Sequence, residues 1–596
     1  MTTHRFSVPD LSRRLLAPIA ALLGLVAGLS VLILPSPAPT TASPTEFSAE
    51  RAMASINRLA DEPHSVLRRE AHDRARDDVI GMFADLGYTA DVHSDPLFDF
   101  SEPVDKETFD MLSAEQQAAV KDAPAETIVV DVPGKSERTM ALMAHYDSAT
   151  VEADENGHQH ITDGTSLGAA DDGYGVAAIV ETLRALKAEG RQPENSLKIV
   201  ITDAEEIGLI GARNEMRHHR ADYENVDLVL NLEARGMSGP AFMFETSPNN
   251  SAVAGYFLSH VKQPVSSSLL PSLYARMPNG TDMNVLIPKG FTVLNIAAIG
   301  EAEHYHHSTD APRYVDHSTL QHYGDQVLGL TRAWAFEGQA PTLTADGDLH
   351  FFQLWRGLTV RYPAAVGTGL GCLAVIAALG VVAVRARSLR WKRVLGTVWG
   401  LTWRSALASA AAGLVQLGAM AMKWAPASGL GPNPLLPWMF AGGALIGVGL
   451  TVRFVVRRWK EGLGQETVAA VLLLLAAACV PLVVLLPGAA YVLVLPTLAL
   501  ALTALAPQRV RPVVGALAAF IMVVIFAPTV LLIHELLSLS AVWVTVFFAI
   551  VPVAPLTLVL LQAGSRRTRN TTARTSSSSD AVPDGAATAG RAAATA

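Results

Sequence analysis

The residues best suited to chemistry are histidines and carboxylates that follow short apolar segments or glycine-rich turns. The set comprises His145, Asp147, Asp171, Asp172, Glu205, Glu206, Glu233 and the histidines at 304, 306 and 307. Imidazole and carboxylate are the ligands that zinc takes in catalytic sites. Two divalent ions sharing a carboxylate would activate water near neutral pH, and an adjacent carboxylate would move the proton. The set therefore indicates metal-assisted hydrolysis.

Each member of this set also has a simpler interpretation when it is taken alone. The pair Glu205 and Glu206 is typical of a solvated helix start, where carboxylates suit the helix dipole. The pair Asp171 and Asp172 is typical of a helix N-cap. Only the order of the whole set, and its common position after apolar segments, favours a metal site. The chain has no GxSxG motif, so a serine hydrolase is unsupported.

An α/β domain must position these residues. The chain alternates short apolar runs with helical stretches, which predicts a mostly parallel central sheet with helices on both faces. Strands are expected over 127–132, 139–144, 197–202, 228–232, 241–245 and 292–296, and helices over 49–62, 65–86, 175–188, 211–218, 250–260 and 318–335. In such a sheet, ligands bind beyond the carboxyl ends of the strands, where the polar residues lie.

Composition adds a second kind of domain. The chain has 596 residues, of which 50% are hydrophobic and 17% charged, so a disordered chain or a coiled coil is excluded. Residues 36–361 carry a net charge of −24 and the remainder carries +15. This division favours an acidic, water-soluble domain attached to a membrane domain, and it argues against nucleic-acid binding. Neither of the two cysteines precedes Cys372, so a cysteine zinc site is excluded in the acidic part.

The membrane domain is predicted from apolar runs of about 20 residues. Such runs cover 15–35, 362–384, 396–422, 435–456, 467–487, 489–506, 512–533 and 540–562. Basic residues concentrate in alternate loops, which places both termini in the cytoplasm and the acidic domain outside it. The expected order is a cytoplasmic segment 1–14, a first membrane helix 15–35, a linker 36–48, the acidic domain 49–345, about seven membrane helices over 362–562 and a disordered cytoplasmic tail 563–596. A cleaved signal peptide is the alternative for 15–35.

The order of the motifs resembles that of a known family. HYDS, GAADDGYG, DAEEIGLIGA, NLEARG and YHHSTD follow one another between about 145 and 310. In this order they resemble the MH-clan di-zinc exopeptidases, of the aminopeptidase Y, aminopeptidase S and glutamate carboxypeptidase II type. NLEARG, the segment 280–282 and the following multi-pass region are most like the group of vacuolar membrane proteases and endoplasmic reticulum metallopeptidases.

The resemblance implies two Zn²⁺ ions per chain and a role for each matching position. It implies that His145 and Glu233 bind one zinc, that Glu206 and His306 bind the other, and that Asp171 bridges both. Asp147 would orient His145, Glu205 would be the general base, and Tyr305 would help to stabilise the tetrahedral intermediate. Asp310 would be an acidic partner four residues after His306. The choice between His306 and His307 stays open.

The resemblance also implies a function: a membrane-anchored zinc metallopeptidase that removes N-terminal residues from peptides. Its partners would be peptide substrates and the lipid bilayer, with no nucleic acid, and its oligomeric state stays open. The alternatives are a peptide-binding or cyclase-type relative, and a transporter with a peptidase-like domain. Transporters place ionisable residues within the membrane, whereas here only Arg404 lies clearly inside an apolar run. The membrane would be the plasma membrane of a prokaryote, or the vacuolar or endoplasmic reticulum membrane of a eukaryote.

Overall fold

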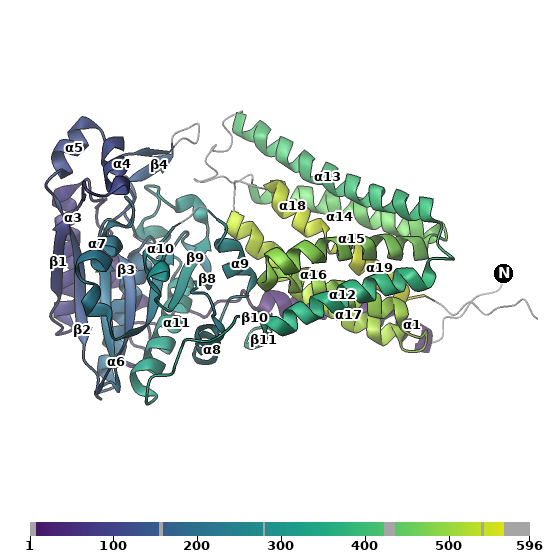
Figure 1. The fold of residues 1–596 in the computed structure, drawn as a ribbon, viewed down its shortest axis with the longest axis horizontal. Coiled ribbons are helices and arrows are strands. Elements are labelled where there is room, and N and C mark those ends of the chain that lie inside the picture. Colours follow the sequence, from purple (N-terminus) through teal and green to yellow (C-terminus); the bar gives the residue numbers. More distant parts are fainter. Residues whose placement is uncertain (1–7, 154–158, 278–279, 422–435, 538–541, 566–596) are drawn as a thin grey trace, which may run out of the picture.

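The computed structural model describes residues 8–153, 159–277, 280–421, 436–537 and 542–565. The chain forms an α/β domain and a helical bundle, which lie end to end along the longest axis of the molecule (Figure 1). The predicted cytoplasmic tail lies almost entirely outside the described residues, and so does the first half of the predicted N-terminal segment. The α/β domain is inserted between the first and the second helix of the bundle.

A seven-stranded sheet forms the centre of the α/β domain, in the order β1-β2-β6-β3-β7-β9-β8. The strands are β1 (Asp91–Pro96), β2 (Pro124–Val132), β6 (Asn195–Thr202), β3 (Ser136–His145), β7 (Val226–Ala234), β9 (Val293–Gly300) and β8 (Ser238–Thr246). The four strands β6, β3, β7 and β9 are parallel, while the pairs β1–β2, β2–β6 and β8–β9 are antiparallel. The predicted α/β class is confirmed, and the antiparallel strands at both edges make the sheet mixed.

Helices cover both faces of this sheet. On one face lie α2 (Ala49–Leu59), α3 (Arg69–Asp85), α6 (Gly173–Ala188), α8 (Ser251–His260) and α11 (His317–Phe336), which share the largest apolar core with the strands. On the other face lie α7 (Ile210–His218) and the short α10 (Met283–Leu286), over a smaller core. The central α6 is buried along almost its whole length, which explains its largely apolar sequence.

Several short elements have no counterpart in the sequence prediction. They are α4 (Pro103–Met111), α5 (Ala114–Val120), α9 (Leu269–Tyr274), the hairpin of β4 (Val151–Ala153) and β5 (Gln159–Ile161), and the hairpin of β10 (Leu349–Trp355) and β11 (Leu358–Pro363). These segments are too short for a hydrophobic period to stand out. The hairpin β10–β11 extends beyond residue 345, where the acidic domain was expected to end, and leads directly into the bundle.

The bundle contains long apolar helices that run roughly along its axis (Figure 1). They are α1 (Val8–Ser30), α12 (Ala364–Arg385), α13 (Trp391–Ala421), α14 (Leu436–Lys460), α15 (Gly464–Leu485), α16 (Tyr491–Leu505), α17 (Arg511–Leu537), α18 (Val542–Ile550) and α19 (Val553–Ala563). Among the described residues, the spans 364–385, 464–485, 511–535 and 542–563 are long and apolar enough to cross a membrane. The last of these is divided between α18 and α19, next to Pro552.

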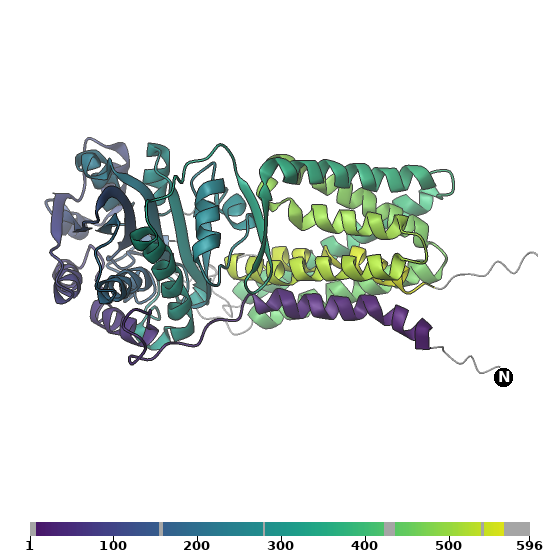
Figure 2. The ribbon, with the colours of Figure 1, turned by 90° about the horizontal axis from the view of Figure 1, so that it is seen from below.

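Helix α1 packs closely against α17, and Figure 2 shows it running along one edge of the bundle. Two glycines four residues apart allow this approach. A Cβ atom on Gly24 would lie 2.7 Å from the carbonyl oxygen of Phe520, and one on Gly28 would lie 2.9 Å from that of Val524. Small residues with this spacing let helix backbones meet in a membrane. The first apolar run is therefore an integral part of the bundle in this structure.

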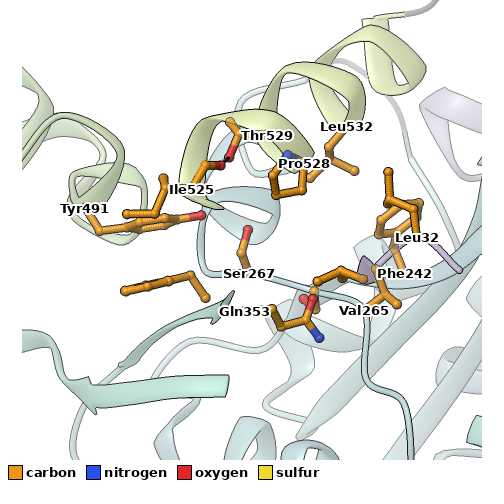
Figure 3. A pocket seen from close by; sticks show the side chains of 13 residues that line it. Leu32, Phe242, Val265, Ser267, Gln353, Tyr491, Ile525, Pro528, Thr529 and Leu532 are labelled. Carbon is orange, nitrogen blue, oxygen red and sulfur yellow. Dashed lines mark hydrogen bonds between the residues drawn. The ribbon is translucent and has the colours of Figure 1, made fainter. Parts of the chain in front are cut away.

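The two parts of the molecule meet through a mixed polar and apolar junction. Ser268 donates a hydrogen bond of 2.7 Å to the carbonyl oxygen of Gly488, and the ring of Phe352 stacks on that of Tyr491 with centroids 4.7 Å apart. A small cavity lies beside this contact, lined from the bundle by residues such as Tyr491 and Leu532 and from the α/β domain by residues such as Phe242 (Figure 3).

Candidate functional site

The predicted site residues meet at the carboxyl ends of the parallel strands. His145 is the last residue of β3, Glu233 lies near the end of β7, and Glu205 and Glu206 follow β6. Because these three strands are neighbours in the sheet, their ends bring the side chains to one edge. Asp171 reaches the same edge from the turn before α6, whose N-cap is Asp172.

Three overlapping groups of side chains are close enough to hold a metal ion. In each group the possible ligand atoms lie within 4.8 Å of one another. The groups are His145, Asp171 and Glu233; Asp171, Glu206 and His306; and His145, Glu205 and Glu206. Asp171 belongs to the first two groups through different oxygens: Oδ1 lies 3.3 Å from His145 Nε2, and Oδ2 lies 3.4 Å from His306 Nε2.

Asp147 holds Glu205, Glu206 and His145 in position. Its Oδ1 accepts a hydrogen bond of 3.0 Å from the backbone N–H of Glu205, and its Oδ2 accepts one of 3.2 Å from that of Glu206. Nδ1 of His145 donates a hydrogen bond of 3.0 Å to the backbone carbonyl oxygen of Asp147 and lies 3.4 Å from its carboxylate, which leaves Nε2 of that ring facing Asp171. One buried aspartate thus orients the imidazole and both glutamates.

His306 and Asp310 close the other side of the site. His306 Nε2 lies 3.1 Å from Glu206 Oε2, and its residue has a φ of 59°, a left-handed conformation that turns the ring into the site. Asp310 accepts hydrogen bonds from the backbone N–H groups of Ala170 (2.7 Å) and Asp171 (3.3 Å), so it holds the turn that carries Asp171. His307 takes part in none of the three groups.

The electrostatics of the site are those of carboxylates crowded away from water. Burial raises the pKa of Glu205 well above its ordinary value, and the charge of Glu233 raises it further. Burial also raises the pKa of Glu206, to about 7. Burial alone would lower the pKa of His306, but the charges of Glu206 and Asp171 raise it to about 10. Buried carboxylates in such numbers need a compensating positive charge.

Unpaired buried atoms show where such a charge would act. Within the described residues, Asp171 Oδ2, Glu206 Oε1 and His306 Nε2 are buried and accept or donate no hydrogen bond. Buried polar atoms of this kind are rare in folded proteins unless an ion or water satisfies them. All three belong to one group of possible ligands. The donor set, imidazole and carboxylate, matches what zinc takes in catalytic sites, so these residues fit the metal.

Tyr305 lines the pocket beside the cluster. Its ring stacks on that of His306, with centroids 3.7 Å apart. Burial raises the pKa of Tyr305 well above its ordinary value, and nearby carboxylates add to the shift. The phenol therefore stays protonated at neutral pH and can donate a hydrogen bond to an oxygen in the pocket.

The apolar wall of the pocket was not predicted. It is formed by Leu209, Phe244, Leu270, Tyr274, Met277 and Ile299. Leu270 and Tyr274 come from α9, a helix of six residues with no readable period. Phe244, Leu270 and Ile299 also belong to a core cluster that includes Val31, just after α1, and Leu532 of α17. Residues at the end of the bundle therefore pack against the apolar wall of the pocket.

Asp282 is a further buried carboxylate near the cluster that the sequence did not assign to the site. It accepts a hydrogen bond of 2.6 Å from the hydroxyl of Thr202, the last residue of β6. Burial raises its pKa to about 6. In the sequence, only the segment 280–282 indicates this residue, and it is used there only as part of the resemblance to the family.

The region that holds the site is similar in sequence to known proteins. The family model described as Peptidase family M28 matches residues 127–331, a range that holds every residue of the cluster. The vacuolar membrane protease of Lachancea thermotolerans is 27% identical over 290 residues, which is 47% of this chain and 28% of that protein. Endoplasmic reticulum metallopeptidase 1 of Mus musculus is 25% identical over 220 residues, 36% of this chain and 24% of that protein.

Solved structures also match. A zinc aminopeptidase from Bacillus subtilis covers 51% of this chain with 99% of its own, at 14% identity and a TM-score of 0.38. A glutaminyl cyclase of Porphyromonas gingivalis covers 48% of this chain with 98% of its own, at 18% identity and a TM-score of 0.36. The chain spans less than a third of the length of the curated relatives named above. Residues 127–331, which hold the cluster of possible metal ligands at the strand ends, are thus similar to peptidase family M28.

Proposed function

We propose that this protein is a membrane-anchored metallopeptidase that uses two zinc ions to remove N-terminal residues from peptides. The observation that carries the proposal is the shared carboxylate of Asp171, which lies between His145 on one side and His306 on the other. A carboxylate with two oxygens in two separate ligand groups is suited to bridging two ions. The M28 domain supports a peptidase, and the finer roles below are part of the proposal.

In this proposal His145, Asp171 and Glu233 hold one zinc, and Asp171, Glu206 and His306 hold the other. Zinc, when bound, supplies an activated water and polarises the scissile carbonyl. Glu205 would accept a proton from the attacking water and pass it to the leaving amine. Tyr305 donates a hydrogen bond to the oxyanion that develops on the substrate.

The same proposal places the catalytic domain outside the cytoplasm. The ends of α12 and α14 and the starts of α13 and α17 lie at the end of the bundle that points away from the α/β domain (Figure 1). These ends and the adjoining loops carry most of the basic residues of the bundle, including Arg385, Arg393, Arg458 and Arg511. Basic loops stay on the cytoplasmic side, so the α/β domain faces the opposite side.

Cleavage by the full chain in detergent tests the proposal. Matched peptides with free and with N-acetylated amino termini are incubated with the protein, with chelator, and with chelator followed by zinc, and the products are identified by mass spectrometry. Stepwise loss of N-terminal residues from the free peptides alone, abolished by chelator and restored by zinc, is the expected result. Cleavage of both sets would contradict the requirement for a free amine. Loss of ammonia from peptides with N-terminal glutamine, without cleavage, would indicate a cyclase instead.

The variant Glu205→Gln tests the proton-transfer role. We expect it to keep its zinc and its unfolding midpoint while kcat falls by about 10²- to 10⁴-fold, the usual contribution of a positioned acid or base. Glu224→Gln changes an exposed glutamate in the same way and should keep the wild-type rate. A Glu205→Gln protein with near wild-type kcat would remove Glu205 from the mechanism.

A further inference from the structure

A groove lined with arginines lies between α13 and α14, at the end of the bundle away from the catalytic domain. Its lining consists of Arg390, Arg393, Arg404, Leu450, Arg453, Phe454, Arg457, Arg458, Glu461 and Leu463. Six guanidinium groups thus share the groove with one carboxylate. Arginine stays protonated in proteins, so the groove is strongly positive. We propose that it binds the headgroup of an anionic phospholipid.

The few acidic groups nearby leave most of this charge uncompensated. Arg457 pairs with Glu461 at 2.8 Å, and Arg390 pairs with Glu466 at 2.7 Å. Arg453 forms no ion pair with any described residue. Arg390, Arg393, Arg453 and Arg457 are exposed, so an anion can reach them at this end of the bundle. The planar guanidinium matches a phosphate with two parallel hydrogen bonds.

The groove is built into the packing of the two helices. Arg458 of α14 donates a hydrogen bond of 2.8 Å to the carbonyl oxygen of Arg393 in α13. The guanidinium of Arg404 lies over the ring of Phe454, 4.1 Å from its centroid, and donates a hydrogen bond of 2.8 Å to the carbonyl oxygen of Gly400. A Cβ atom at Gly400 would lie 2.6 Å from the Phe454 ring. A glycine at this position therefore allows the ring and Arg404 to meet.

The groove lies where two apolar helices end: Arg390 follows α12 and Leu463 directly precedes α15, and both helices are apolar enough to cross a membrane. The length of α13 agrees with this level. The helix has 31 residues, which corresponds to about 46 Å. The hydrocarbon core of a bilayer is about 30 Å thick, so about 16 Å of the helix lies outside it. The first residues of α13, Trp391, Lys392 and Arg393, are polar or interfacial in character, which assigns the surplus to this end. Arg404, about 20 Å along the helix, then lies near the boundary of the core.

Exposed apolar side chains also lie on the two helices that form the groove. Trp399 (71% exposed) and Trp403 (53%) lie on α13, and Leu445 (73%) and Ile446 (64%) lie on α14. Such a surface suits acyl chains, and tryptophan is enriched at the interface between headgroups and hydrocarbon. A basic groove between two helices that also expose apolar side chains suits both ends of one lipid molecule. A soluble phosphate would use only the basic part.

Lipid binding by the delipidated full chain in detergent tests this inference. Native mass spectrometry measures the affinity for phosphatidylglycerol and for phosphatidylcholine, with inorganic phosphate as competitor. We expect the double variant Arg404→Gln/Arg453→Gln to bind phosphatidylglycerol at least tenfold more weakly than wild type. The matched control is Arg387→Gln/Arg509→Gln, which removes two exposed arginines at the same end of the bundle outside the groove. This control should bind phosphatidylglycerol as wild type does.

Three results would overturn the inference. One is equal phosphatidylglycerol binding by the groove variant and the control. Another is equal affinity of wild type for phosphatidylcholine, which carries the same phosphate but no net charge. The last is displacement of phosphatidylglycerol by millimolar inorganic phosphate, which would assign the groove to a soluble anion. If the double variant fails to fold, the single variant Arg453→Gln takes its place, since this side chain forms no ion pair with a described residue, and at least a threefold weakening is expected.

Discussion

At the scale of single residues, the site depends on one buried carboxylate that serves three neighbours. The carboxylate of Asp147 accepts hydrogen bonds from the backbone N–H groups of Glu205 and Glu206 and lies next to His145 Nδ1. Removing one of its two acceptor oxygens must leave one of these contacts unmade. The position of both glutamates therefore depends on a side chain that would not itself contact the metal.

This dependence predicts the effect of Asp147→Asn. The amide keeps the size of the side chain but places an NH₂ group against a backbone N–H donor. We expect the zinc affinity, measured by competition with a chromogenic chelator, to fall by about 10- to 100-fold, as is usual when a partner of a metal ligand is removed. Asp122→Asn, at an exposed position, is the control. Unchanged affinity in Asp147→Asn would show that His145 keeps its orientation without this carboxylate.

The sequence alone predicts that these polar residues lie together, but it does not predict the apolar wall of the pocket beside them. His145, Glu205 and Glu233 were predicted to lie together because each follows an apolar segment that had to be a strand of one sheet. Tyr274 and Met277 follow no such rule. They come from α9 and the segment after it. They line the pocket because this region packs against apolar residues of the bundle. That contact joins residues far apart in the chain.

At the scale of elements, Gly324 in α11 allows a close contact with the ring of Phe47. A Cβ atom there would overlap the ring of Phe47, in the segment that leads into the α/β domain. We expect Gly324→Ala to destabilise the protein by about 1–3 kcal/mol, because a packed core has no room for the methyl group. Urea unfolding of the full chain in detergent measures the change.

Gly255 in α8 provides the matched control. No atom lies within 4 Å of a Cβ built at this position. Gly255→Ala should therefore stabilise the protein by about 0.5–1 kcal/mol, through the helix propensity of alanine. Opposite signs for the two substitutions are expected. Stabilisation of similar size at both positions would show that helix propensity, and not the contact with Phe47, governs the response.

The edge strand β1, absent from the sequence prediction, carries a pH-dependent contact with α7. The sequence of β1, DVHSDP, has no apolar alternation that would mark a strand. His93 Nδ1 lies 2.9 Å from Glu215 Oε1, and this hydrogen bond raises the pKa of His93. The ring of His93 also stacks on that of His219, which lies 2.9 Å from Asp95.

This contact predicts a loss of stability at alkaline pH. Since the pKa of His93 is higher in the folded protein than its unfolded value of 6.5, its contribution is complete below that pH and is lost as pH rises through the raised pKa. We expect His93→Gln to reduce the fall in the thermal unfolding midpoint between about pH 6 and about pH 8.5. His260→Gln, a partly buried histidine on α8, should keep the wild-type fall. An identical pH dependence in all three proteins would exclude the contact as its source.

At the scale of the whole molecule, the α/β domain and the bundle are joined by packing as well as by the chain. Tyr491, at the start of α16, stacks on Phe352 in β10, and Ser268, next to α9, bonds to Gly488. Since α9 also provides part of the pocket wall, the order of the pocket is tied to the junction. An isolated catalytic domain would expose this apolar surface.

The substitution Tyr491→Ala tests this connection. Loss of the ring removes an aromatic contact that is worth about 0.5–1.5 kcal/mol beyond its buried area. We expect faster amide hydrogen exchange in α9 and β10 and unchanged exchange in β3 and β7. Leu502→Ala removes an exposed side chain from the same helix and should leave all four elements unchanged. Unchanged exchange in α9 would show that the bundle does not support the pocket.

The insertion of the catalytic domain between α1 and α12 has a consequence for release from the membrane. The chain enters the domain through the segment after α1 and leaves it through β11, so two covalent tethers join it to the same end of the bundle. One proteolytic cut in either tether leaves the domain attached by the other. Shedding a soluble enzyme would require two cuts, one on each side of the domain. The arrangement would keep the proposed peptidase activity at the membrane surface even after one cut in the chain.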